Sequence, residues 1–115
     1  MGSVTLAEMT EEMRRRVGEN SGFGHTVKFD FGEDGKIFID TVSVPNRVTN
    51  DDDEAETTVR VKFADFCKIS SGQKSPAAAF MAGRLKVTGN VGVSWKLGSI
   101  IGPERAGRPA DTDTE

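Results

Sequence analysis

The spacing of hydrophobic residues changes once, near residue 25, and this change limits the folds open to the chain. Before it, apolar residues recur every three or four positions across residues 6–17, the spacing of one buried helix face. Beyond it, short runs alternate between apolar and polar residues, as strands do when one face is buried. The chain is therefore expected to combine helices with strands.

A first helix is expected over residues 5–18. Thr5 and Glu8 form a capping box at its start, and Gly18 follows its last turn. Glutamates occupy its first half and three arginines, at positions 14–16, its second half, an order that suits the helix dipole. We interpret these charged side chains as a solvated outer face.

Five later runs have the character of strands: residues 27–31, 37–40, 41–50, 57–63 and 84–89. The turn "GEDG" joins the first two runs as a hairpin, and Pro45 places the third at an edge or bend, because proline cannot donate to a ladder. The acidic run "DDDEAE" that follows is a solvated loop. In the fourth run, Val59, Val61 and Phe63 are expected on the buried face.

Two short helices are expected over residues 64–72 and 75–83, the second with Ser75 as cap and Pro76 in its first turn. The segment after Asn90 is ambiguous. Strict alternation favours a hairpin strand, in which Val91, Val93, Trp95 and Leu97 share one face. A helix would instead place Val93, Leu97, Ile100 and Ile101 on one stripe. Residues 103–115 are polar and are expected to be a disordered tail.

Length and charge exclude several classes of protein. The 115 residues suit one domain, and a net charge of -3 argues against a nucleic-acid partner, which would require a basic face. The single cysteine, Cys67, cannot form an internal disulfide, and no apolar run near the amino terminus is long enough for a signal peptide or a membrane span. We therefore expect a cytoplasmic protein.

Few residues could carry chemistry. His25 is the only histidine and Cys67 lies far from it in the sequence, so a nucleophilic pair is a weak hypothesis. The acidic run lacks the glycine and the closing glutamate of a calcium loop, and one histidine with one cysteine does not make a zinc site. No enzyme activity, catalytic residue, metal or cofactor is expected. Apolar residues gather instead in the carboxyl-terminal half, where they could form plain core or wall a pocket.

The segment "SPAAAFMAGRLKVTGNVGVSWKLG", preceded by "ADFCKISSG", closely resembles the end of the sterol carrier protein two domain. The matching positions are Phe80, Gly83, Arg84, Leu85, Lys86, Gly89, Asn90, Lys96 and Leu97. The runs "FDFGEDGKIFID" and "TTVRVKFADF" also resemble those of small bacterial members, so residues 1–102 are assigned to one such domain.

The resemblance implies an α+β fold. A five-stranded, mostly antiparallel sheet would be covered on one face by about five helices, with an apolar tunnel between the layers. It also implies that the segment after Asn90 is a helix. The family binds sterols, fatty acids, fatty acyl-CoA and phospholipids without making or breaking bonds. Trp95 stands where a smaller residue is usual and would narrow the tunnel, which favours a fatty acyl chain over a sterol.

The expected function is therefore non-catalytic binding and carriage of a lipid or acyl-CoA by a monomer or weak homodimer, with transient membrane contact. Met13 is an expected lid contact. The residues expected to line the lipid-binding tunnel are Phe66, Ile69, Phe80, Met81, Leu85, Trp95, Leu97 and Ile100. The alternative is a dimerisation or docking module whose tunnel is filled by its own side chains, with Trp95 as a plug.

Overall fold

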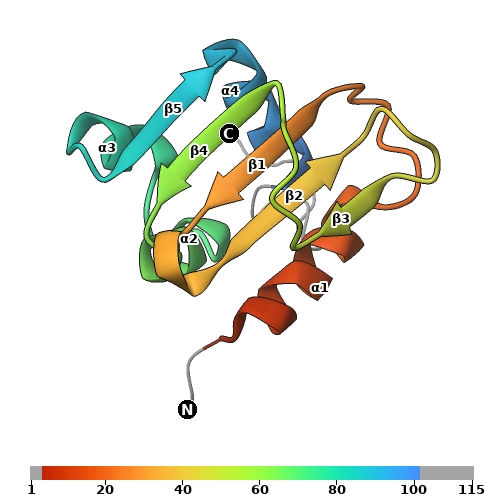
Figure 1. Cartoon of the computed structure of the whole chain (residues 1–115). Helices are drawn as coiled ribbons and strands as arrows, with labels where there is room; N and C mark the ends of the chain where they lie inside the picture. Colours follow the sequence, from red (N-terminus) through yellow and green to blue (C-terminus); the bar gives the residue numbers. More distant parts are fainter. Residues whose placement is uncertain (1–3, 102–115) are drawn as a thin grey trace, which may run out of the picture.

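A five-stranded mixed sheet forms one layer of the molecule (Figure 1). The computed structural model describes residues 4–101, apart from the side chains of residues 99 and 100. The strands are β1 (Thr26–Asp30), β2 (Lys36–Asp40), β3 (Arg47–Thr49), β4 (Thr57–Val61) and β5 (Leu85–Gly89). They lie in the order β3-β2-β1-β4-β5, in which β1 and β4 are parallel and the other neighbours are antiparallel. The expected mostly antiparallel sheet is confirmed.

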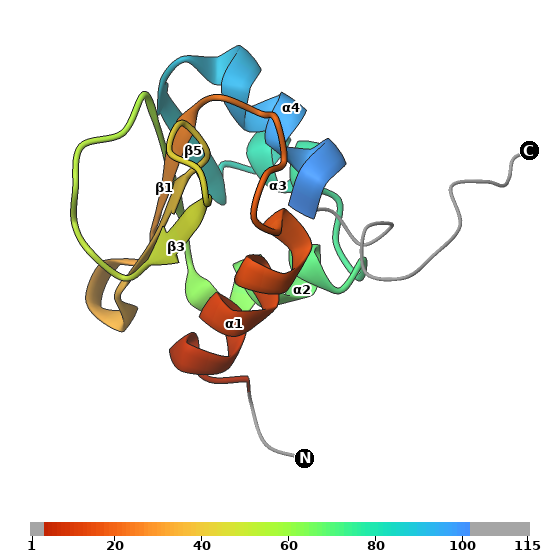
Figure 2. The same ribbon diagram turned by 90° about the vertical axis from the view of Figure 1, so that its right-hand side faces the viewer.

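Helices cover one face of this sheet, as Figure 2 shows. The α-helices in the described residues are α1 (Leu6–Val17), α2 (Phe63–Ser70), α3 (Pro76–Met81) and α4 (Val91–Ile101). A short 3-10 turn, η1 (Gly32–Asp34), joins β1 to β2 in place of a simple hairpin turn. Four α-helices and this turn thus stand where about five helices were expected. None of the helices within residues 4–101 combines the length and the apolar character that crossing a membrane demands.

Strand alternation sends one set of apolar side chains toward the helices. Val27 pairs with Ile39 and Phe29 with Ile37, and these side chains are buried in the core between the two layers. Phe38 points the other way and is nevertheless buried, because the acidic loop of residues 50–56 crosses that face (Figure 1). Lys28 Nζ donates a hydrogen bond to Asp52 Oδ1 at 2.6 Å, which holds this loop against the sheet. The acidic loop is exposed as expected, and it also covers part of the sheet.

One expected strand ends early. β4 stops at Val61, and Phe63 is the first residue of α2 instead of the last buried position of the strand. Phe63 still reaches the core by another route, since its ring packs edge-on against Phe31 with centroids 5.1 Å apart. Alternation alone cannot distinguish a final strand residue from a first helical residue when both are apolar.

The segment after Asn90 is a helix, as the family resemblance implied and against its strict alternation. Val93, Leu97 and Ile101 recur every four residues in α4 and are all buried, whereas Val91 and Trp95 are 42% and 41% exposed. The side chain of Ile100 and the expected tail at residues 103–115 lie outside the described residues. Burial of the residues at helical spacing stabilises the helix despite two internal glycines.

Arg16 corrects the expectation that all charges of α1 face solvent. The capping box of Thr5 and Glu8 is present, with Glu8 N donating to Thr5 Oγ1 at 3.1 Å. Arg16, however, follows Met9 by seven residues and Met13 by three, so it falls on the buried stripe and is only 8% exposed. Its guanidinium lies among the carboxyl-terminal ends of two other helices.

Candidate functional site

A cavity of about 460 Å³ lies between the sheet and the helices. Its floor is formed by side chains of β1, β4 and β5, and its walls by α1, α2, the loop before α3, and α4. The lining residues are Met13, Phe29, Val59, Val61, Phe66, Ile69, Ser70, Gly72, Lys74, Ser75, Pro76, Leu85, Ser94, Trp95, Leu97, Gly98 and Ile101. Most of this surface is apolar, and Lys74 is its one charged side chain among the described residues.

The structure brings five of the eight expected lining residues to this cavity: Phe66, Ile69, Leu85, Trp95 and Leu97. Met13, the expected lid contact, also lines it. Phe80 and Met81 do not, being 41% and 83% exposed. The reason is the orientation of α3, which buries only Ala79 and turns its last residues away from the sheet.

Apart from Leu85 of β5, the sheet floor was missing from the expected lining. Phe29, Val59 and Val61 lie on the helix-facing side of β1 and β4 and contribute to the cavity wall. Their alternation showed that one face is buried, but it could not show that part of this face borders an open space. That difference depends on how far the helices stand from the sheet, which no local pattern encodes.

A buried carboxylate fixes the loop at the rim of the cavity. Asp65, 5% exposed, accepts hydrogen bonds from Lys74 Nζ and from Arg84 Nη1, each at 3.2 Å. The hydrogen bond from Lys74 holds the pKa of Asp65 below its usual value, helped by the positive charges of both partners and opposed by burial. Lys74 is thereby kept at the rim, where it lines the cavity.

Arg16 joins the ends of two helices that border the cavity. Its Nη1 donates to the carbonyl oxygens of Ser70, at 3.1 Å, and Ile101, at 2.8 Å, while its Nε pairs with Glu12 Oε2 at 2.6 Å. Burial lowers the pKa of the guanidinium, which nevertheless stays protonated. A cation at these carbonyl groups also suits the negative ends of the helix dipoles.

Reactive groups lie elsewhere. Of the described lining residues, none is histidine, cysteine, aspartate or glutamate. Cys67 borders a shallow hollow beside α1 instead, and burial raises the pKa of its thiol, which disfavours the nucleophilic thiolate. Within residues 4–101, no group of three or more potential metal ligands occurs.

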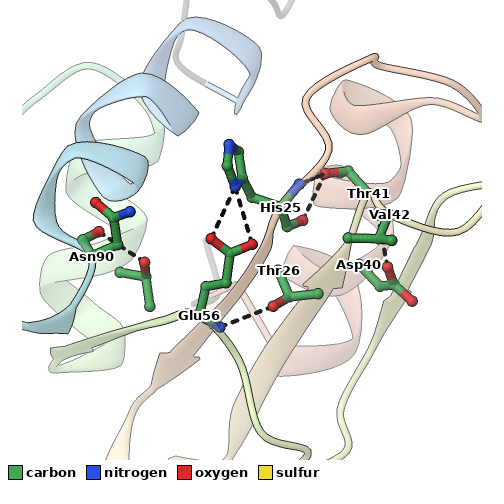
Figure 3. A network of polar contacts seen from close by, with 8 residues as sticks. His25, Thr26, Asp40, Thr41, Val42, Glu56 and Asn90 are labelled. Carbon is green, nitrogen blue, oxygen red and sulfur yellow. Dashed lines mark hydrogen bonds and ion pairs between the residues drawn. The ribbon is translucent and has the colours of Figure 1, made fainter.

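His25 belongs to a polar network at one end of the sheet (Figure 3). Its Nδ1 lies 2.9 Å from Glu56 Oε1, and the backbone of Glu56 receives a hydrogen bond from Asn90 N at 3.3 Å. Thr57 Oγ1 donates to Asn90 O at 2.8 Å. These contacts hold the start of α4 against β4, so His25 is part of a structural junction away from the cavity lining.

Comparison with known proteins assigns the chain to a family. Residues 10–102 match the model of the SCP-2 sterol transfer family. The chain belongs to this family. Its SCP-2 relatives include human "Sterol carrier protein 2", 31% identical over 99 residues, and "Non-specific lipid-transfer protein-like 1" of Caenorhabditis elegans, 31% identical over 98 residues. These matches cover 83% and 82% of the chain, but 17% of the human protein and 79% of the nematode protein.

Solved structures show the same SCP-2 fold. The apo form of sterol carrier protein 2 from Yarrowia lipolytica superposes with a TM-score of 0.71 at 17% identity, covering 92% of this chain and 94% of that one. Sterol carrier protein 2 from Aedes aegypti, solved with the C16 fatty acid palmitate, gives 0.62 at 20% identity, covering 83% and 88%. The SCP-2 family is one of lipid binding and transfer, and most of the named relatives are carriers or lipid-transfer proteins.

Proposed function

We propose that this SCP-2 domain binds one long acyl chain in the cavity and carries it without making or breaking a bond. The observation that carries the proposal is the apolar cavity of about 460 Å³ between sheet and helices. This volume lies within the ~300–1,000 Å³ of typical small-molecule sites. Phe66, Ile69, Leu85, Trp95 and Leu97 would contact the chain, together with the sheet floor.

Exclusion of water would supply the affinity. An acyl chain that buries roughly 300 Å² of apolar surface gains about 7 kcal/mol before the costs of association. Such binding needs no catalytic group, which agrees with a lining whose reactive side chains are three serines and one lysine. Two of these serine hydroxyls are hydrogen-bonded to the backbone of their own helices: Ser94 Oγ donates to Val91 O, and Ser75 Oγ accepts from Ala78 N.

The ligand class that we propose is a fatty acid or its CoA thioester in the cytoplasm. Lys74 is the single cation of the described lining, and it would place an acidic head group at the rim while the chain enters the apolar interior. A docking module with a self-filled tunnel has less support. Trp95 is 41% exposed and forms part of the wall, and about 460 Å³ beside it is left open.

Trp95 provides the test, because it is the only tryptophan and lines the cavity. Titration of a C16 fatty acid should shift its fluorescence emission in a saturable way, with micromolar or tighter affinity and a matching heat in calorimetry. A C4 acid is the matched control, since it has the same carboxylate with little surface to bury, and should leave the spectrum unchanged. An unchanged spectrum and no heat with the C16 acid would refute the carrier proposal.

A further inference from the structure

Exposed apolar side chains gather beside the cavity. Phe80, Met81, Val91 and Trp95 are 41–83% exposed and belong to α3 and α4. The rings of Phe80 and Trp95 meet edge to face, with centroids 5.7 Å apart, so the two helices share one apolar surface. Trp95 also lines the cavity, so this surface continues into its wall. We call these four residues the mouth patch.

The segment that carries the mouth patch has charged side chains of one sign only. From Phe66 to Ile101 the chain has no aspartate or glutamate, although the whole protein has a net charge of -3. The cations of this segment are Lys68, Lys74, Arg84, Lys86 and Lys96. Lys74 lines the cavity and Lys96 follows Trp95 in α4. Lys86, next to the buried Leu85 in β5, projects from the opposite face of the sheet. The nearest carboxylate in sequence, Asp65, is buried between Lys74 and Arg84.

Exposed aromatic and methionine side chains among cations are typical of surfaces that enter the interface of an anionic membrane. Each lysine near such a membrane contributes about a fivefold increase in affinity. Met81, 83% exposed at the end of α3, projects from the surface and would fit a fluid lipid interface. An acidic protein would match the charge but would have to provide a pocket for these apolar side chains.

We propose that the mouth patch docks on bilayers that contain anionic phospholipid. Phe80, Met81 and Trp95 would enter the interface, and Lys74 and Lys96 would face lipid phosphates. Docking in this orientation turns the cavity toward the membrane, so that an acyl chain could pass between them without crossing water. This inference rests on the proposed carriage of an acyl chain and adds the surface at which the ligand is exchanged.

Vesicle sedimentation with the full chain tests the docking. Vesicles of phosphatidylcholine with about 30% phosphatidylglycerol should bind the protein and shift Trp95 fluorescence, and pure phosphatidylcholine vesicles should bind it far less. Met81→Asp should weaken binding to the anionic vesicles by about tenfold or more, because it places a carboxylate in the interface. Lys96→Gln should weaken it by about fivefold, and added salt should reduce that difference.

The matched control variants make the same kinds of substitution away from the mouth patch. Val4→Asp introduces a carboxylate at a valine that is 43% exposed before α1, and Arg60→Gln removes a cation whose side chain is 72% exposed on the other sheet face. Both control variants should bind anionic vesicles as the wild type does. Equal binding to neutral and anionic vesicles, or equal loss in Val4→Asp and Met81→Asp, would overturn the proposal.

Ligand binding without vesicles separates the two proposals. Met81→Asp and Lys96→Gln should bind the C16 acid normally, which shows that they fold and that any defect lies in docking. A chain that binds anionic vesicles through Met81 but takes no fatty acid would contradict carriage and support docking. Two other outcomes would overturn the docking proposal, each with vesicle binding unchanged in Met81→Asp. Loss of a dimer in sedimentation analysis would assign the patch to a second copy of the chain. Loss of binding to polyglutamate would assign it to an acidic protein.

Discussion

Lys74 fixes the rim of the cavity, and under the proposed function it would also select for an acidic head group. Its Nζ lies 3.2 Å from Asp65 Oδ1, which fixes the loop before α3, and the same side chain lines the rim. Arg84 contacts the other oxygen of Asp65 at the same distance but does not line the cavity. The two cations can therefore be separated experimentally.

Lys74→Met should lower the affinity for a C16 fatty acid by about three- to tenfold and leave the affinity for the C16 alcohol unchanged, because only the acid has a charge to pair. Arg84→Met is the matched control. It removes the other ion pair of Asp65, and it should leave both affinities unchanged. Calorimetry with the two ligands measures this, and an equal loss for acid and alcohol would contradict a head-group role for Lys74.

Asp65 predicts a pH dependence of stability. Its pKa is lower in the folded protein than the ~3.9 of an unfolded chain, chiefly because Lys74 donates to the carboxylate. The stabilisation is therefore complete above the unfolded pKa and is lost as the pH falls through the folded pKa. Asp65→Asn should cost about 1 kcal/mol of unfolding free energy at pH 7, since both partners are partly solvated, and less near pH 2, below the unfolded pKa.

Urea unfolding at the two pH values measures the effect of Asp65→Asn. Asp53→Asn, in the exposed acidic loop, is the control and should leave the unfolding midpoint unchanged at both. The same destabilisation by Asp65→Asn at pH 7 and at pH 2 would show that the ion pairs do not stabilise the rim.

The burial of Arg16 could not be predicted from the sequence. Its spacing from Met9 and Met13 put it on the buried stripe, but its charge favoured solvent. The outcome depends on two carbonyl groups, of Ser70 and Ile101, that are 54 and 85 residues away in sequence. A local pattern contains no information on partners this distant.

At the scale of elements, α4 presents one stripe of residues to the cavity. Ser94, Trp95, Leu97, Gly98 and Ile101 all line it. The alternation of Val91, Val93, Trp95 and Leu97 predicted a strand, and the family resemblance alone predicted the helix. The apolar pattern fits both periods over these few residues, and only packing against α1 and β4 distinguishes them.

Gly98 offers a way to fill the cavity without disturbing the core. A Cβ placed on it meets no atom within 4 Å, and its backbone is not in the left-handed region. Gly98→Phe should therefore fold at least as stably as the wild type, because it also replaces a glycine inside a helix. It should weaken C16 fatty acid binding by about tenfold or more.

Gly92→Phe is the matched control on the same helix. Gly92 is exposed and does not line the cavity, and a Cβ there makes only an ordinary contact with Asn90 Oδ1 at 3.5 Å. This variant should bind the fatty acid normally. Unchanged binding by Gly98→Phe in a calorimetric titration, with its helix intact by circular dichroism, would move the ligand site away from α4.

At the scale of the whole molecule, the chain separates its charge. The segment from Phe66 to Ile101 contributes five cations and no acid, and the acids lie mainly in α1 and the loops before β4. The overall charge of -3 hides this division. The sequence contains both facts, but only the fold shows that the acid-free segment forms the part of α2 after Asp65, and α3, β5 and α4, around the cavity.

The cavity, too, can be seen only in the folded molecule. Periodicity predicted the sheet, α1 and the caps of α3, because each depends on neighbours within a few residues. The open space depends on how α1, α2 and α4 stand over β1 and β4, which local spacing does not determine. Phe80 and Met81 lie on the outer surface instead of in the lining because of the orientation of α3, which local spacing does not determine either.

The most direct test of the central claim is an NMR structure of the protein with a ¹³C-labelled C16 fatty acid. Intermolecular nuclear Overhauser contacts should join the acyl methylenes to the methyl groups of Val59, Val61 and Leu97, which lie on opposite walls of the cavity. Contacts limited to the exposed side chains of Met81 and Val91, or none at all, would contradict the account.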